Sequence, residues 1–372
     1  MDNRLRIGFV GPGWIGRVQL QKLHKRTDVL VSAVHGRDYE CTASLLHELG
    51  LPADCNCRSY EALLDREIDA VWLASPNQHH GPQAIAALKA GKHLFCEKPT
   101  AISYRDDVEL QRLASESPHL ISFVDFVLYF NPMEQKLLQM VREGVFGDLT
   151  QVQINYRHPI NTSGGRAWKL TKAAMGDAIS MGISHAISLI TWIYAANGQH
   201  PVSVFAFSDR ARVRNFEPDP IWNILIRFSG GGTAFCFGNI DFNAGYDLYH
   251  NVTGTAGSFT FDSARPHEQK VRFVSQNVED GQTIWPLAVG TDTTHAWPSN
   301  MTLPDSGDVL THGLDDAIDC FLASVRAMKT SPLSLQHSSI IAEIGWAAQL
   351  SAVTGQQVAL PLDPSLMQAV TG

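Results

Sequence analysis

Residues 5–16 read Leu-Arg-Ile-Gly-Phe-Val-Gly-Pro-Gly-Trp-Ile-Gly, and this stretch decides the fold of the chain. It begins as an apolar strand, and a helix-like run over residues 14–26 follows. Between strand and helix lie Gly11, Gly13 and Gly16. In a G-x-G-x-x-G pattern the first glycine permits a tight turn, the second lets backbone approach a pyrophosphate, and the third lets helix pack on strand. The stretch therefore predicts a strand–turn–helix unit that binds a dinucleotide.

The rest of the first 125 residues alternates strands and helices. The apolar runs predict strands at Arg6–Val10, Leu30–Val34, Ala70–Ala74, Leu94–Cys96 and Leu120–Val124. Helical segments are expected at Cys41–Leu49, Tyr60–Leu64, Gly81–Lys89 and Tyr104–Ser115. Alternation at these lengths favours a parallel sheet covered on both faces. Residues 1–125 are therefore predicted to form a Rossmann domain.

The pattern changes near residue 150, where polar and apolar residues alternate as in a strand with one wet face. Strands are expected at 151–156, 202–207, 222–228, 233–239, 252–255, 258–262 and 271–275, with a helix over 177–194. This predicts an α+β domain over residues 126–372, built on an open, mainly antiparallel sheet. Its closing helices, near 314–328 and 338–354, could equally pack back on the first domain. Residues 285–309, with His295 and Trp297, have the length of a functional loop.

Composition restricts the class of protein. A chain of 372 residues favours two domains, and 44% hydrophobic with 18% charged residues is typical of a soluble globular protein. The net charge of −8 argues against nucleic-acid binding. No apolar run reaches the roughly 18 residues of a membrane helix, and no signal-peptide pattern opens the chain, so we expect a cytoplasmic protein. The scattered cysteines predict reduced thiols and no metal site.

Lys98 is the strongest catalytic candidate. Residues 93–99 read His-Leu-Phe-Cys-Glu-Lys-Pro, an apolar strand that delivers Glu97 and Lys98 to the carboxyl edge of the predicted sheet. Nicotinamide chemistry takes place at that edge in doubly wound folds. An amine in a desolvated pocket beside a positively charged ring has a lowered pKa and can exchange a proton near neutrality.

The end of the second strand bears on the choice of cofactor. An acidic residue there usually binds the ribose 2′-hydroxyl of NAD, but this chain has Gly36 followed by Arg37. A small residue and a planar cation suit a 2′-phosphate, which favours NADP over NAD. Alternatively, Arg37 stacks on adenine and NAD binds equally well.

Further cofactor contacts are expected from residues at the same sheet edge and in the glycine turn. His80 either takes part directly or packs beneath the nicotinamide. The complete predicted set for NAD(P) is Gly11, Gly13, Trp14, Ile15, Gly16, Gly36, Arg37, Ser75, Pro76, Asn77, His80, Glu97 and Lys98.

The second domain contributes His185 on the predicted helix over 177–194. A single helical histidine is often a core residue, but Trp168 and Lys169 precede it in a stretch of unusual charge. Between Asp148 and Asp177 there is no acidic residue, whereas the stretch contains Arg157, His158, Arg166, Lys169 and Lys172. In an acidic chain this favours an anionic group on the substrate, such as a uronate or sulfonate. Solvated loop cations or subunit-interface pairs explain it as well.

The chain resembles the glucose–fructose oxidoreductase/inositol dehydrogenase (Gfo/Idh/MocA) family over nearly its whole length. The resemblance rests on the glycine turn, Ser75-Pro76-Asn77 with His80, Gly91-Lys92-His93, Glu97-Lys98-Pro99, Phe130-Asn131-Pro132, Gly147-Asp148-Leu149, Trp168-Lys169, His185 and the closing Gly355–Pro361. It implies nicotinamide-dependent oxidation or reduction of a ring hydroxyl on a sugar or polyol. It also implies a homodimer or homotetramer assembled through the open face of the second sheet.

One departure from the family concerns the acid expected one helical turn before the histidine. In this chain that position is Met181. The position three residues after His185, where the family has a second acid, is Ser188. Asp177 lies one turn further back and either substitutes for the acid or caps the helix. Tyr129 and Tyr156 are other hydroxyls that could face substrate. The predicted substrate contacts are Tyr156, Arg157, Arg166, Trp168, Lys169 and Met181.

Three functions fit these residues. The first is a sugar dehydrogenase or reductase in which Lys98 and His185 handle the hydroxyl proton. The second is a glycosidase that transiently oxidises a ring hydroxyl, eliminates the anomeric group, adds water and returns the hydride to the sugar. The third is a cofactor-sensing regulator without turnover, which the presence of both Lys98 and His185 disfavours.

Overall fold

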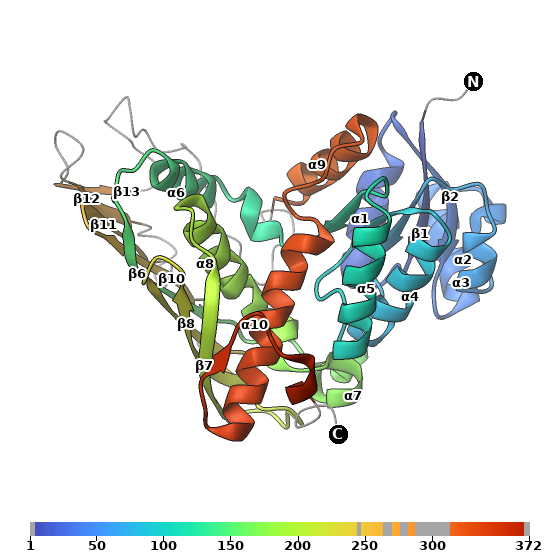
Figure 1. Ribbon diagram of the computed structural model, residues 1–372. Helices are drawn as coiled ribbons and strands as arrows, with labels where there is room; N and C mark the ends of the chain where they lie inside the picture. The colour runs from blue at the N-terminus through green and yellow to red at the C-terminus, as the bar shows by residue number, and fades with distance from the viewer. Residues whose placement is uncertain (1–3, 244–246, 263–269, 276–281, 287–312, 368–372) are drawn as a thin grey trace. The chain divides into compact units, whose positions relative to one another are not determined.

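The computed structural model describes residues 4–243, 247–262, 270–275, 282–286 and 313–367 (Figure 1). The chain divides into two compact units, Met1–Phe126 with Leu314–Ser339, and Val127–Gly313 with Ile340–Gly372. Of the loop expected over 285–309, only Trp285 and Pro286 are described, and they belong to a strand; His295 and Trp297 lie outside the described residues.

The first unit contains a sheet of parallel strands in the order β2-β1-β3-β4-β5, which confirms the Rossmann prediction (Figure 1). Asp38, Ser59 and Ser103 cap three of its helices, each accepting a hydrogen bond from a backbone N–H of the first turn. The elements are β1 (Leu5–Val10), α1 (Trp14–His24), β2 (Val29–His35), α2 (Tyr39–Leu49), α3 (Tyr60–Leu64), β3 (Ala70–Leu73), α4 (Asn77–Lys89), β4 (His93–Cys96), α5 (Tyr104–Glu116), β5 (Ser122–Val124) and α9 (Leu314–Ala327).

A row of aromatic rings explains why α9 belongs to this unit. Phe9, Trp72, Phe95 and Phe123 stand opposite one another on β1, β3, β4 and β5. Successive rings stack, with centroids 3.4 Å apart for Trp72 and Phe95, and Phe321 of α9 meets the row edge-on. All five side chains are fully buried, so α9 closes a core face that the first 125 residues leave open.

The second unit is built on a mixed sheet in the order β13-β12-β11-β10-β6-β9-β8-β7-β14, in which β6 and β9 are parallel and the other described pairs are antiparallel. The elements are α6 (Pro132–Arg142), β6 (Leu149–Arg157), α7 (Lys172–Met175), α8 (Ser184–Ala196), β7 (Pro201–Asp209), β8 (Ile221–Phe228), β9 (Thr233–Asn239), β10 (Asp247–Gly254), β11 (Gly257–Asp262), β12 (Lys270–Ser275), β13 (Gln282–Pro286) and β14 (Val358–Ala359). Helix α10 (Leu335–Thr354) begins in the first unit and continues into the second.

Helix α8 packs on one face of this sheet, against β6 and α6 (Figure 1). Among the described residues, the segment Lys172–Ala196 is long and apolar enough to cross a membrane by length and composition. However, 89% of its most apolar window is buried inside the structure, as in the core helix of a globular domain.

The helix predicted over 177–194 is interrupted. Residues Ile179–Ile183 form a π-helical turn, and α-helix resumes at Ser184. A π turn contains one residue more than an α turn, and such turns often occur at functional sites. Met181 lies inside this π turn, and its backbone N–H donates to the Asp177 oxygen at 3.0 Å, four residues back.

Candidate active site

The glycine turn has the predicted geometry at Gly11 and Gly16, and it is open at Gly13. Gly11 adopts φ +82°, and a Cβ there would lie 2.5 Å from the Ser75 nitrogen. A Cβ on Gly16 would lie 2.2 Å from the Gly11 oxygen, whereas a Cβ on Gly13 would meet nothing within 4 Å. Helix α1 begins here without a side-chain cap and without an acidic residue in its first turn. The open space at Gly13 and the uncapped helix start fit a pyrophosphate. Trp14 is 54% exposed beside it, and Ile15 follows.

The residues after β2 explain the absent acid. A Cβ on Gly36 would lie 2.3 Å from Thr42 Oγ1, so helix α2 leaves no room for a side chain. Arg37 is exposed. The Asp38 carboxylate accepts a hydrogen bond from the Cys41 N–H at 2.9 Å and caps α2. The Asp38 carboxylate is thus engaged in capping, and Arg37 is an exposed charged side chain at this edge.

His80 connects two loops at the carboxyl edge of the first sheet. Its Nδ1 lies 2.6 Å from the Pro99 oxygen and its Nε2 lies 2.6 Å from the Ser75 oxygen. Burial lowers the pKa of His80, and the two carbonyl contacts oppose that shift. Because the residue is 1% exposed, we assign it to positioning the loop that carries Lys98. Ser75 Oγ donates to Gln83, and Asn77 is buried at the start of α4 after Pro76.

Lys98 follows the carboxyl end of β4, and its peptide bond to Pro99 is cis. Burial lowers the pKa of the amine below the usual range of lysine, while Coulomb attraction to Glu97 and Asp125 opposes that shift. A lysine that can lose its proton at moderate pH suits general acid–base chemistry.

Half-buried Glu97 and buried Asp125 form a carboxyl pair beside this amine. The two side chains share a hydrogen bond. Glu97 Oε1 also accepts from Gln19 Nε2 at 2.7 Å, and Gln19 Oε1 accepts from Trp72 Nε1 at 3.0 Å. Asp125 was missed in the sequence, although an acid directly after the apolar strand β5 marks the same sheet edge.

The second unit gathers a different set of groups around the start of α8. The rings of Tyr156 and His185 stack with centroids 5.7 Å apart, and Tyr156 Oη lies 3.0 Å from His158 Nδ1. A Cβ on Gly182 would lie 3.1 Å from the Tyr156 ring, so this glycine admits the close approach. The structure therefore brings Tyr156 and His185 together and adds His158, which sequence reasoning treated only as part of a charged stretch.

The acidic side chain proposed as a substitute is engaged elsewhere. Asp177 accepts hydrogen bonds from the backbone N–H and the hydroxyl of Ser180 and from Gln349 Nε2, at 2.8, 3.0 and 3.1 Å. Burial raises the pKa of Asp177, and the hydrogen bonds from Ser180 oppose that shift. Asp177 therefore caps the helical run, the second of its two expected roles. Met181 is 8% exposed in the π turn, and the Ser188 hydroxyl donates to the His185 oxygen at 2.8 Å.

Tyr129 lies in a 3-10 turn, Val127–Phe130, and its ring meets Trp192 edge-on with centroids 4.7 Å apart. Trp192 follows His185 by seven residues, which is about two turns or 10 Å along α8. Tyr129 therefore packs beside α8 well beyond the turn that carries His185. Asn131, which follows, caps α6 by accepting from the Met133 N–H at 2.9 Å.

One arginine of the charged stretch before α8 is paired with a distant acid. Arg157 Nε lies 2.9 Å from Asp247 Oδ2, and Asp247 is 8% exposed. Glu217 accepts from the Lys172 backbone N–H at 2.8 Å. The Arg157 side chain is therefore ion-paired, while 42% of it is exposed. Arg166, Trp168 and Lys169 lie in the 3-10 segment Gly164–Leu170, where the Lys169 ammonium is 5.8 Å from the Trp168 ring centroid.

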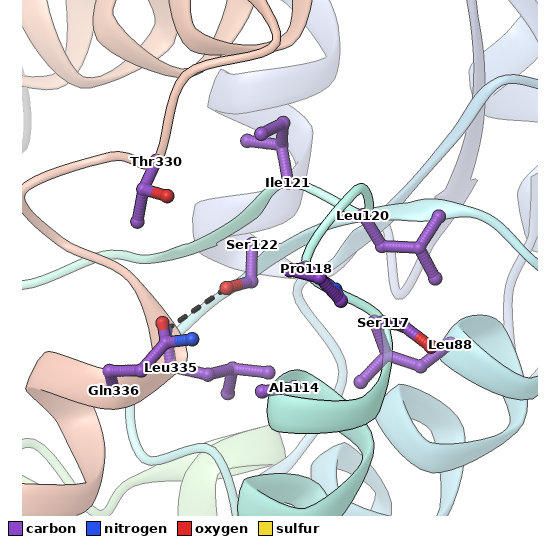
Figure 2. Close-up of a pocket in the computed structure, with 10 residues that line it drawn as sticks. All are labelled: Leu88, Ala114, Ser117, Pro118, Leu120, Ile121, Ser122, Thr330, Leu335 and Gln336. Atoms are coloured by element: carbon purple, nitrogen blue, oxygen red, sulfur yellow. Dashed lines mark hydrogen bonds between the residues drawn. The ribbon is translucent and has the colours of Figure 1, made fainter.

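A hollow in the first unit lies away from this chemistry (Figure 2). Leu335 N–H donates to Ser122 Oγ at 3.0 Å beside it, at the amino end of β5. Lys98 follows the carboxyl end of the neighbouring strand, so the hollow is at the opposite edge of the sheet. Its lining is Leu88, Ala114, Ser117, Pro118, Leu120, Ile121, Ser122, Thr330, Leu335 and Gln336. In such folds ligands bind outside the carboxyl ends of the strands.

Lys98 with its carboxyl pair belongs to the first unit, and His185 with Tyr156 belongs to the second. The first group combines an amine with two carboxyls, and the second combines a histidine ring with a tyrosine ring.

Known proteins resemble this chain in sequence and in fold. It is 32% identical over 173 residues to a glycosyl hydrolase family 109 protein of Stenotrophomonas maltophilia, covering 42% of this chain and 37% of the relative. It is 30% identical over 162 residues to an inositol 2-dehydrogenase of Corynebacterium glutamicum, covering 43% and 47%. The matched stretches thus span less than half of either relative. The structure of a levoglucosan dehydrogenase in complex with NADH superimposes with a TM-score of 0.80 at 19% identity, covering 97% of this chain and all of that one.

Two domain models of one family match the chain. The model described as an oxidoreductase family with an NAD-binding Rossmann fold matches residues 5–125. The model of the GFO/IDH/MocA C-terminal domain matches residues 135–260. The two matches together span more than half of the chain and agree with both units of the structure, so the protein belongs to the Gfo/Idh/MocA family.

Proposed function

We propose that the protein is a nicotinamide-dependent oxidoreductase that acts on a ring hydroxyl or ketone of a sugar, polyol or sugar derivative. The observation that carries this proposal is the pairing, within one unit, of a glycine turn open at Gly13 with a lysine of lowered pKa at the carboxyl edge of the sheet. The inositol dehydrogenase relative and the levoglucosan dehydrogenase fold support the sugar-like substrate class.

The residues that would hold the dinucleotide are the glycine turn, the start of α1 and the chain after β2. When bound, a nicotinamide supplies the hydride acceptor for oxidation and the hydride donor for reduction. During oxidation the Lys98 amine accepts the proton of the substrate hydroxyl as the carbon–oxygen single bond becomes a carbonyl. During reduction the Lys98 ammonium returns that proton to the oxygen. We assign His185 and Tyr156 to contacts with substrate hydroxyls.

The test is a substrate panel followed by absorbance at the nicotinamide band. Neutral, carboxylated and sulfonated sugars are incubated with NAD and with NADP, and product is quantified in parallel. We expect reduced cofactor to accumulate one-to-one with oxidised product for at least one sugar. The proposal fails if the protein binds dinucleotide but no sugar, polyol or keto-sugar produces a change in cofactor redox state or a product.

A second function has specific support, namely hydrolysis of a glycoside with recycled cofactor. The glycosyl hydrolase family 109 relative favours it, and so does Met181 at the place of the family acid. The same panel separates the two functions, provided that it includes chromogenic glycosides. A recycling glycosidase releases aglycone with substoichiometric dinucleotide and no net change in absorbance, whereas a dehydrogenase does not release aglycone.

We further propose that the cofactor is NADP(H) in preference to NAD(H). Arg37 is exposed at the end of β2, no side chain fits at Gly36, and the Asp38 carboxylate caps α2. An arginine offers a fork of N–H donors that matches a phosphate.

An anionic substrate remains part of the proposal through Arg166 and Lys169, two basic residues of the segment Gly164–Leu170. Replacing Arg166 or Lys169 with alanine should raise the Michaelis constant of a carboxylated sugar about fivefold relative to its neutral analogue, as for loss of one exposed charge-assisted contact. An unchanged ratio would limit the substrate class to neutral sugars.

The open face of the second sheet supports a homodimer or homotetramer. Four phenylalanines lie on this face, Phe205 and Phe207 on β7 and Phe235 and Phe237 on β9, with β8 between the two strands. Phe207 is 59% exposed. A second copy of the chain would cover these rings. Replacing Phe207 with glutamate should give a monomer in light scattering, and a wild-type protein that is itself monomeric contradicts this proposal.

A cytoplasmic location is also part of the proposal. All six cysteines are described by the structure and are free thiols, several of them buried, as in proteins of a reducing compartment.

A further inference from the structure

Asp125 is a buried acid that the mechanism above does not use. The residue is 3% exposed at the carboxyl end of β5, and its backbone N–H donates to the Cys96 oxygen at 2.9 Å. Its Oδ1 is buried and has no hydrogen-bond partner among the described residues. An ionised carboxylate with one buried oxygen lacking a donor is costly, whereas a neutral acid in the same place is much less so.

The hydrogen bonds around Glu97 have a defined direction. The indole N–H of Trp72 can only donate, so Gln19 Oε1 accepts and Gln19 Nε2 must donate to Glu97 Oε1. Glu97 therefore acts as the acceptor on this side. The hydrogen bond between the two carboxyls then requires one proton. The hydrogen bond from Gln19 stabilises the ionised form of Glu97, whereas the buried Oδ1 of Asp125 has no donor among the described residues to stabilise an ionised form. The shared proton is therefore assigned to Asp125.

The pKa directions agree with this assignment. Burial raises the pKa of Asp125 well above its usual value, and the charge of Glu97 and the hydrogen bond to Glu97 raise it further. For Glu97, burial also raises the pKa, but Lys98, Gln19 and Asp125 oppose that shift. The other titratable groups near the pair are the Cys96 thiol, which burial keeps neutral, and His80, which lies near Lys98.

We propose that Asp125 is a positioning residue that stays protonated, donates its proton to Glu97 in a hydrogen bond, and thereby holds Glu97 as the single carboxylate that sets the charge of Lys98. A neutral carboxylic acid that donates a hydrogen bond within an apolar site has precedent in enzyme active sites. The inference rests on the proposed function for its catalytic meaning, but the protonation itself is independent of turnover.

Two variants with the same branched side-chain skeleton separate this role from a general structural one. Asp125→Asn keeps a neutral group that donates to Glu97, and Asp125→Leu removes the donor. Infrared difference spectroscopy at pH 7 should show the carbonyl stretch of a protonated carboxyl in the wild type and its loss in Asp125→Asn. Absence of that band from the wild type, or its persistence in Asp125→Asn, would overturn the assignment.

The pKa of Lys98 is then measured by competitive acylation of its amine across pH, with peptide mass spectrometry as the readout. Asp125→Asn should leave the midpoint within about 0.3 unit of the wild type, since charge and donor are kept. Asp125→Leu should lower it by about 1 unit, because Glu97 without its donor takes up a proton and no longer attracts the ammonium. Equal shifts in both variants, or no shift in Asp125→Leu, contradict the proposal.

Turnover provides the catalytic readout. We expect kcat of Asp125→Asn within about threefold of the wild type and kcat of Asp125→Leu lowered at least about tenfold, with dinucleotide affinity unchanged in both. If Asp125→Leu does not fold, the infrared and acylation results on Asp125→Asn still decide the protonation. If no variant and no wild-type sample turns over any sugar, the proposed function fails while these two measurements stand.

Discussion

The two units differ in the kind of chemistry that their functional residues can perform. At the sheet edge of the first unit, Lys98 lies beside the carboxyls of Glu97 and Asp125, and Glu97 accepts a hydrogen bond from Gln19, which itself accepts one from Trp72. Around the start of α8 in the second unit, His185 stacks on Tyr156, and Asp177 caps the helical run. From this difference we propose that proton transfer depends mainly on the first unit and substrate positioning on the second.

The largest expected effect is on Lys98. Replacing it with alanine should lower kcat about a thousandfold, the middle of the range for loss of a general acid–base group. Dinucleotide affinity, measured by fluorescence titration, should change less than about threefold, since the glycine turn is untouched. The matched control is Lys92→Ala. Lys92 directly precedes β4, the strand that leads to Lys98, and its ammonium donates a hydrogen bond to the Ile68 oxygen. A large loss of affinity with retained turnover would place Lys98 in binding instead.

A smaller effect is expected for His185. His185→Ala should lower kcat/KM about a hundredfold, with part of the loss in KM, because a positioning residue acts on substrate binding as well as on the barrier. Ser188→Ala removes a buried hydroxyl from the next turn of the same helix and serves as control. If His185→Ala loses as much kcat as Lys98→Ala at unchanged KM, the division between the two units is wrong.

The glycine turn offers a contrast within the first unit. Gly13→Val should weaken dinucleotide binding at least about tenfold, or 1.4 kcal/mol, with unchanged thermal stability, because the space above Gly13 is open. Gly16→Ala should instead destabilise the fold, because its Cβ would collide with the Gly11 oxygen. Equal dinucleotide affinity of Gly13→Val and wild type would exclude this turn as the pyrophosphate site.

The smallest of these effects concerns cofactor choice. Arg37→Ala should weaken NADP(H) about tenfold or more, as for loss of a charge-assisted hydrogen bond to phosphate, and change NAD(H) little. Dissociation constants for both cofactors provide the test. Equal losses would instead support stacking of Arg37 on adenine.

Much of the first unit could be predicted because its information is local. The roles of Gly11, Gly13 and Gly16 follow from a turn and its two neighbours, and the position of Lys98 follows from one strand. The second unit depends on long-range contacts. The pairing of Arg157 with Asp247 joins residues distant in sequence, and the π turn at Ile179–Ile183 has no period that a pattern search detects. The pairing of Asp125 with Glu97 was not predicted, because it joins residues that follow two different strands and the spacing along either strand does not encode it.

The pH dependence of hydride transfer in a single turnover tests the central claim most directly, namely that the amine of Lys98 carries the proton. Since burial lowers its pKa, the rate of sugar oxidation should rise with pH through an ionisation below the usual range of lysine. The rate of reduction should fall through the same ionisation. In Lys98→Ala the residual rate should lack this dependence. An ionisation that persists unchanged in Lys98→Ala would contradict the account and assign the proton to another residue.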